Sequence, residues 1–144
     1  AGHVGKVEGI EVFNTVLLTP DNRKIIIPNG QIAGGSIENL SAMPTRRIDM
    51  VFGIGYGDDI KKAKGILDEL IAADERILKD PEPTVAVGEL ADSSVNFVVR
   101  PWVNSADYWN VKWDLTEAVK LRFDQEGISI PFPQQDVHMH NVAA

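Results

Sequence analysis

Short hydrophobic runs separated by turn-forming residues fill the first 43 positions. Three of these runs have the length of a strand and are rich in β-branched side chains: 4–12, 12–18 and 23–27. Residues 19–22 are turn formers and predict a hairpin, while Pro28, Asn29 and Gly30 end the third run sharply. Residues 31–34 have room for one helical turn before an extended run at 36–40. The pattern predicts a small β-barrel or half-barrel.

From residue 44 onward, the hydrophobic period alternates between that of a strand and that of a helix. Residues 47–54 place apolar side chains at every second position, and residues 60–73 repeat them at the 3, 4 and 7 spacing of an amphipathic helix. The predicted elements are, in order, a strand at 47–54, a helix capped by Asp58 that fades near Asp74, strands at 84–90 and 94–103, a helix after 107 that ends at Gly127, and a terminal strand at 137–142.

The order β-α-β-β-α-β from residue 47 is that of ferredoxin-like folds, in which helices cover one face of an antiparallel sheet. The sequence therefore predicts an α+β chain. We expect a small β domain at 1–43, a ferredoxin-like domain at 44–133, and a C-terminal strand at 134–144 that could enter an oligomeric barrel.

Composition and charge narrow the range of functions. The chain has 144 residues, with 14 Lys and Arg against 21 Asp and Glu, and its formal charge of −7 argues against nucleic-acid partners. It contains no cysteine, which excludes disulfides, thiolate nucleophiles and Cys-ligated metals. No run approaches the roughly 20 apolar residues of a transmembrane helix. Because the first residues lack an initiator Met and lead at once into a strand, we expect a fragment of a longer protein.

Paired carboxylates at Asp58 and Asp59 are the one candidate for metal-dependent catalysis. They join a strand to a helix, however, and acidic residues at that point satisfy free N–H groups and suit the positive end of the helix dipole. Helix capping is thus the favoured interpretation. No Ser-His-Asp arrangement is recognisable, and glycines 53, 55 and 57 lack the spacing of a phosphate-binding loop. We predict no catalytic residue, no cofactor and no enzyme activity.

His138 and His140 alternate with Val137 and Met139 near the end of the chain. On an extended segment both imidazoles would face the same side, where they could supply two metal ligands. No third His or Glu follows at a suitable spacing, although Asp136 is near, so an exposed polar strand face is the simpler interpretation.

Trp109 and Trp113 are one helical turn apart and lie off the core stripe of their predicted helix. A domain of this size has one core, so a second apolar stripe on the helix must be buried by something outside that core. Interfaces are enriched in Trp, which makes self-association through this face one interpretation and burial against the N-terminal domain the other.

Several segments together resemble the small-conductance mechanosensitive channel (MscS-type) family. They span almost the whole chain and occur in order at compatible spacings: KIIIPNG at 24–30, AGGSIEN at 33–39, DERILKD at 74–80, NFVVR at 96–100 with Trp102 close behind, WDL at 113–115 and GISIPFPQ at 127–134.

This resemblance implies a homoheptamer in the bacterial inner membrane that opens under tension and releases small solutes and ions during hypo-osmotic shock. The part present would be cytoplasmic: an Sm-like β domain, an α/β domain and a terminal strand, which in seven copies enclose a vestibule. Contact with the bilayer would run only through transmembrane helices that this chain lacks, so the chain itself would serve assembly and solute filtering rather than gating. In a sevenfold barrel, the imidazoles of His138 and His140 would form stacked rings.

The resemblance also implies roles for individual residues. Pro28, Asn29 and Gly30 would couple the vestibule to the gate, and Trp109, Trp113, Val137 and Met139 would lie at subunit interfaces. A stand-alone ferredoxin-like ligand-binding or regulatory domain is the alternative function.

Overall fold

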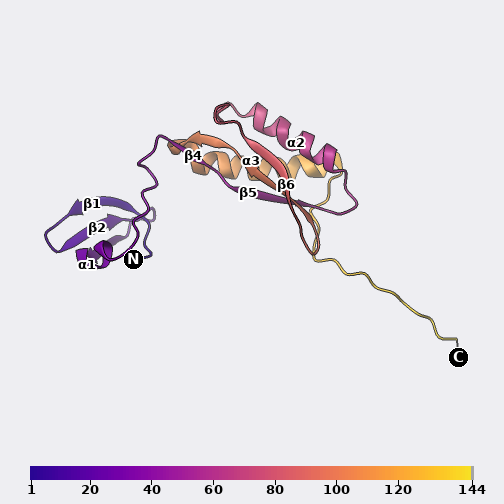
Figure 1. Ribbon diagram of the computed structural model, residues 1–144, viewed down its shortest axis with the longest axis horizontal. Coiled ribbons are helices and arrows are strands. Elements are labelled where there is room, and N and C mark those ends of the chain that lie inside the picture. The colour runs from indigo at the N-terminus through magenta and orange to yellow at the C-terminus, as the bar shows by residue number, and fades with distance from the viewer. Residues whose placement is uncertain (144) are drawn as a thin grey trace. The chain divides into compact units, whose positions relative to one another are not determined.

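The computed structural model describes residues 1–143. The chain forms two compact units, Ala1–Leu40 and Ser41–Ala144. Figure 1 shows the elements of each unit along the chain. No helix in the described part of the chain is both long and apolar enough to cross a bilayer.

The first unit is an antiparallel three-stranded sheet in the order β1-β2-β3, followed by a short helix. Its elements are β1 (Lys6–Ile10), β2 (Asn14–Leu18), β3 (Lys24–Pro28) and α1 (Asn29–Ala33). The predicted hairpin turn is confirmed, because the Asn22 N–H donates to the Thr19 carbonyl at 2.9 Å and Asn22 has a positive φ of 64°. The extended run predicted at 36–40 forms no strand, since no strand of the sheet pairs with it.

Few side chains of the first unit are removed from solvent. Val16 and Ile27 are its only buried hydrophobic residues, and they come from the paired strands β2 and β3. The buried hydroxyls of Thr15 and Thr19 are satisfied by hydrogen bonds within the same unit. The first unit therefore has a very small core of its own.

The second unit contains a three-stranded antiparallel sheet in the order β5-β7-β6, a separate β4–β8 pair, and two long helices. Its elements are β4 (Thr45–Arg47), β5 (Met50–Ile54), α2 (Ile60–Ala73), β6 (Thr84–Leu90), β7 (Val95–Arg100), β8 (Trp102–Asn104), the single turn η1 (Ser105–Asp107) and α3 (Tyr108–Glu126). The crossover from β5 through α2 to β6 leaves a gap that β7 fills, which is the split-βαβ arrangement.

Two of the predicted strands are each divided in the structure. The strand expected at 47–54 becomes β4 and β5, and that at 94–103 becomes β7 and β8. Pro101 causes the break, because it has no N–H to donate to the ladder. The two interruptions lie against each other, with the Ile48 N–H donating to the Pro101 carbonyl at 2.8 Å. The β4–β8 pair and the three-stranded sheet therefore meet at this point, where β4 is followed by β5 and β7 by β8.

The sheet has no fourth strand among the described residues. The segment after α3 reaches the end of β5, where the Gly55 N–H donates to the Ser129 carbonyl at 3.3 Å, but it forms no ladder there. Residues 128–143 contain no helix or strand, so the strand predicted at 137–142 is absent from the single chain. A β-strand needs a neighbouring strand to pair with. That residues 137–142 form a strand by pairing with other copies of the chain remains a prediction.

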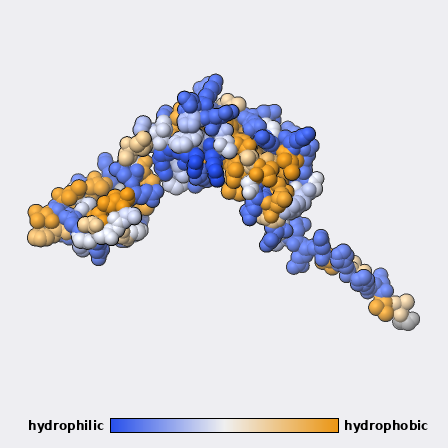
Figure 2. Space-filling model, in the orientation of Figure 1, coloured by the Kyte–Doolittle hydropathy of each residue, from blue (hydrophilic) through white to orange (hydrophobic). Residues whose placement is uncertain are grey.

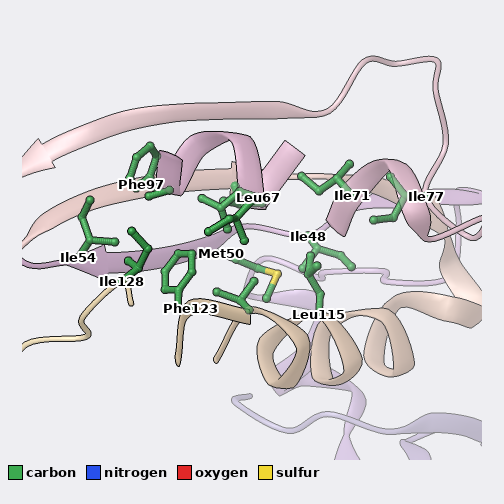
Figure 3. Packing of buried hydrophobic residues seen from close by; sticks show 14 of the residues in the cluster. Ile48, Met50, Ile54, Leu67, Ile71, Ile77, Phe97, Leu115, Phe123 and Ile128 are labelled. Atoms are coloured by element: carbon green, nitrogen blue, oxygen red, sulfur yellow. The ribbon is translucent and has the colours of Figure 1, made fainter. Parts of the chain in front are cut away.

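The core of the second unit lies between one face of the sheet and the helices α2 and α3. Phe97 and Phe123 are fully buried and come from β7 and α3, while Leu67 comes from α2 (Figure 3). The helical periodicity seen in the sequence accounts for this packing: α2 buries Ala63, Ile66, Leu67 and Ile71, and α3 buries Val111, Leu115, Val119 and Phe123. Gly127 ends α3 in the left-handed conformation, with φ of 73°.

The strand β6 contains a bulge at Gly88, where the register shifts between Val87 and Glu89. A Cβ atom added to Gly88 would come within 2.6 Å of a methyl group of Val98 on β7. Glycine therefore allows this edge strand to approach its neighbour closely while carrying one unpaired residue.

Candidate functional site

Asn29 ties the end of β3 to the loop between β1 and β2. Its side-chain amide donates to the carbonyls of Glu11 at 2.9 Å and Val12 at 3.1 Å, and its side-chain oxygen accepts from the Thr15 hydroxyl at 2.7 Å. Its backbone N–H donates to the Phe13 carbonyl at 2.7 Å. Asn29 thus links two segments of the first unit by hydrogen bonds. Its position after a proline did not predict this role.

Pro28 and Gly30, on either side of Asn29, are both exposed. A Cβ atom added to Gly30 would meet no atom within 4 Å, and the residue does not need a positive φ. Asn29 therefore stabilises the turn by hydrogen bonds, whereas Pro28 and Gly30 are exposed on either side of it. Nothing inside the first unit requires glycine at position 30.

Trp109 and Trp113 form an exposed aromatic pair on α3. Their ring centroids lie 5.7 Å apart, and 53% and 61% of their respective surfaces are accessible. The core of the second unit does not cover this stripe, as the spacing of the two tryptophans predicts. Tyr108 extends the pair, with its ring 5.2 Å from that of Trp109 in an edge-on arrangement.

Two cations lie over these rings. The Arg46 guanidinium is 3.8 Å from the centre of the Tyr108 ring, and the Lys112 ammonium is 5.3 Å from that of Trp109. Such contacts favour a fixed orientation of the rings. Trp109 thus contacts Tyr108, Lys112 and Trp113, and both tryptophans remain exposed.

The predicted interface residues Val137 and Met139 are also open to solvent, at 74% and 87% exposure. They follow Gln134 by three and five residues, and the Gln134 N–H donates to the Ser93 hydroxyl at 3.0 Å. Within residues 1–143, no group of three or more His, Asp or Glu side chains could hold a metal ion. His138 and His140 thus have no third ligand among the residues that the structure describes.

The two adjacent carboxylates have different structural roles. Asp59, not Asp58, is the N-cap of α2, and it accepts from the backbone N–H groups of Lys61 and Lys62 at 2.8 and 3.1 Å. The N-cap predicted at Asp58 is therefore wrong by one residue. One of the two carboxylates does cap α2, as predicted, but it is that of Asp59.

Asp58 instead holds the segment that follows α3. One carboxylate oxygen accepts from the Gly55 N–H at 2.9 Å, the Ser129 N–H at 2.9 Å and the Ser129 hydroxyl at 2.6 Å. Burial alone would raise the pKa of Asp58, but the hydrogen bonds from Ser129 and Gly55 outweigh it and lower the pKa. These three residues, which we call the Asp58 latch, were not predicted because Ser129 lies 71 positions away.

Arg76 joins the ends of the two helices. It binds the Asp74 carboxylate through two nitrogen atoms at 2.9 and 2.8 Å and the Asp114 carboxylate on α3 at 3.0 Å. Hydrogen bonds from Arg76 lower the pKa of Asp74 more than burial raises it. Asp74 and Arg76 belong to the family-like segment 74–80 and Asp114 to the segment 113–115, so the cluster ties the chain reversal after α2 to α3.

A groove of about 760 Å³ lies beside that reversal, between α2 and β6. Ile71, Ile77 and Val85 contribute apolar surface, and Asp68 and Glu82 are among its acidic residues. The groove is of a size that holds small ligands in other proteins. It supplies no arrangement of nucleophile and base.

The fold and these surfaces define the class of protein: an α+β chain with a small β unit, a ferredoxin-like unit and apolar surfaces that its own core does not cover. Comparison with known families makes this specific. The chain matches "Mechanosensitive ion channel, beta-domain" over residues 1–42 and "Mechanosensitive ion channel MscS, C-terminal" over residues 48–130. It belongs to the MscS family of mechanosensitive ion channels, which is a family of channels and not of enzymes.

Similar proteins agree with this membership. The chain is 51% identical over 139 residues to an uncharacterized MscS family protein, slr0639, of Synechocystis, in a match that covers 96% of this chain and 47% of the relative. It is 48% identical to a small-conductance mechanosensitive channel of Edwardsiella ictaluri, with 96% and 49% coverage. The chain thus spans about half the length of these relatives.

A solved structure confirms the fold class. The crystal structure of Helicobacter pylori MscS in its closed state matches with a TM-score of 0.88 and 34% identity, over 96% of this chain and 55% of that chain. The predicted α+β class and the resemblance to the MscS-type family are both confirmed.

Proposed function

We propose that this chain is the cytoplasmic vestibule part of a tension-gated channel in a bacterial inner membrane. The complete channel would release small solutes and ions on hypo-osmotic shock. In this proposal seven copies assemble, and the part described here serves assembly and solute filtering, has no enzyme activity, and contacts the bilayer only through transmembrane helices outside this sequence. The apolar surface that each copy leaves uncovered is the observation that carries the proposal.

The first unit supplies most of this surface. Domains of about 40 residues rarely bury enough apolar area to be stable alone. Here two hydrophobic side chains are buried, whereas many others are largely exposed (Figure 2): Val4, Val7, Ile10, Val12, Phe13, Ile26, Ile37 and Leu40. Contact with further copies would bury these side chains and supply the missing core.

The aromatic pair on α3 supports the same conclusion for the second unit. Trp109 and Trp113 are large, rigid and already oriented, so their burial would cost little side-chain entropy. Residues of this type contribute most of the binding energy in many protein interfaces. We assign them, together with Val137 and Met139, to contacts between subunits.

Filtering would follow from the charge of each copy. The chain has an excess of seven acidic groups. A compartment enclosed by several such copies would have a negative potential that attracts cations and repels anions. No reacting group is required for this role.

The mass of the chain in solution tests the proposal. We expect light scattering after size-exclusion chromatography to give about seven times the 15.8 kDa of one chain. Replacing both Trp109 and Trp113 by Ala should lower that mass, whereas Leu121→Ala, at an exposed position elsewhere on α3, should leave it unchanged. A mass near 15.8 kDa for the unaltered chain would contradict self-assembly and favour a stand-alone domain.

Gate coupling through Pro28, Asn29 and Gly30 is a second part of the proposal. Because a Cβ atom at Gly30 meets nothing in its own chain, Gly30→Ala should leave the first unit intact. In a full-length channel it should nevertheless change closing or inactivation, since the exposed turn would meet neighbouring parts. Unchanged patch-clamp currents would count against this coupling.

A further inference from the structure

The histidine pair near the end of the chain is a site that remains incomplete in one copy. Residues 131–143 run as an extended trace without helix or strand (Figure 1). In an extended chain alternate residues face the same side. Asp136, His138 and His140 therefore share one side, and Val137 and Met139 share the other.

The spacing of the two histidines suits joint binding of one ion. Alternate residues of an extended strand are about 6.6 Å apart along the chain, close enough for two imidazoles to converge. One chain offers the two imidazoles of His138 and His140, while Zn²⁺ takes about four ligands. Since the described residues of a single chain form no group of three suitable side chains, the remaining ligands must come from elsewhere.

A second copy is the source that the structure favours. The side chains of Val137 and Met139 are exposed, and the backbone of this segment has no ladder partner among residues 1–143. Pairing between copies of the segment would bury the apolar side and satisfy the backbone. Neighbouring strands lie about 4.8 Å apart, so such pairing would bring histidines of different copies together on the opposite side.

We propose that His138 and His140 of neighbouring copies together bind a divalent transition-metal ion, with Zn²⁺ as the model ligand. Imidazole favours Zn²⁺, Ni²⁺ or Cu²⁺ over Mg²⁺ and Ca²⁺, which prefer oxygen ligands. The acidic excess of the chain favours cations in general. The inference rests on the self-assembly proposed above, because the site is incomplete without a second copy.

Calorimetric titration of the intact chain with ZnCl2 at pH 7.5, with the mass followed by light scattering, tests the site. We expect saturable binding with fewer than one Zn²⁺ per chain, no comparable binding of Mg²⁺, and reversal by EDTA. The double variant His138→Ala/His140→Ala should lose this binding while keeping its assembly mass. His3→Ala, which removes the third histidine of the sequence, should bind like the unaltered chain.

The outcomes separate this inference from the proposed function. An assembled chain that binds no Zn²⁺, or a double variant that binds it normally, would overturn the metal site and leave the assembly proposal intact. A chain that is monomeric without metal but gains mass with Zn²⁺ only when both histidines are present would support the site and contradict spontaneous assembly. A chain that stays monomeric and binds no Zn²⁺ would overturn both.

Discussion

The Asp58 latch should stabilise the second unit by an amount that the structure allows us to work out. One carboxylate oxygen accepts three hydrogen bonds, from Gly55 and from two groups of Ser129. Each bond is worth about 0.5–1.5 kcal/mol net, and values near the low end apply because water can replace Asp58 at the exposed Ser129. Asp58→Ala should therefore lower the free energy of unfolding by about 2 kcal/mol, and Asp58→Asn, which keeps an acceptor oxygen, by about 1 kcal/mol.

The pH dependence gives a second, independent signature. Because the pKa of Asp58 is lowered in the folded state, its contribution is complete above the unfolded pKa and is lost as the pH falls through the folded pKa. The unfolded value is about 3.9. The stability difference between the unaltered chain and Asp58→Asn should thus be constant from about pH 5 to 7 and should shrink below about pH 4.

Urea unfolding followed by tryptophan fluorescence measures both effects, because all three tryptophans lie in the second unit. Protein concentration must be held fixed, since assembly would couple to unfolding. Asp92→Asn, at an exposed position in the turn between β6 and β7, is the matched control and should change stability little. An Asp58→Ala variant as stable as the unaltered chain, or an Asn variant whose deficit persists at pH 3, would refute the reasoning.

Three further substitutions test packing and backbone geometry, two of them by the same urea unfolding and the third by amide exchange. Phe123→Ala empties a fully buried site and should cost about 3–5 kcal/mol, whereas Leu121→Ala at an exposed site on the same helix should cost less than about 0.5 kcal/mol; equal effects would contradict the packing described. Asn29→Ala removes three side-chain hydrogen bonds and should speed amide exchange in the β1–β2 loop, while Gly30→Ala should not. Gly88→Ala should cost about 1–3 kcal/mol because its Cβ would lie 2.6 Å from a methyl group on β7, and an unaffected variant would show that the strands can separate there without cost.

The long periodic elements of the second unit could be predicted because their signal is local. The stripe on α3 repeats from Val111 to Phe123, and Gly127 ends the helix in the left-handed conformation that favours glycine. The strand predicted at 94–103 was wrong at Pro101, although proline is a local signal for a break because it cannot donate to a ladder. The matching break at Ile48 has no such local signal. Ile48 leaves the sheet only because Pro101 faces it, and that pairing is a property of the fold.

The functional surfaces were less predictable, for a related reason. Asp58 and Asp59 are chemically identical candidates for the same cap, and the choice between them depends on Ser129, which is distant in sequence. Trp109 and Trp113 could be assigned to a second stripe by spacing alone, but whether another part of the chain covers that stripe is a tertiary question. A strand at 137–142 would need partners outside one copy, which no intrachain pattern specifies.

The bulge at Gly88 has a consequence for how copies of this chain avoid aggregation. A regular edge strand offers a continuous row of N–H and C=O groups to any strand that approaches it, and sheets can then grow edge to edge into fibrils. The extra residue between Val87 and Glu89 interrupts that row on β6 and bends the strand away. Edge-to-edge growth is therefore disfavoured at β6, and the self-assembly proposed above would have to use surfaces other than this edge.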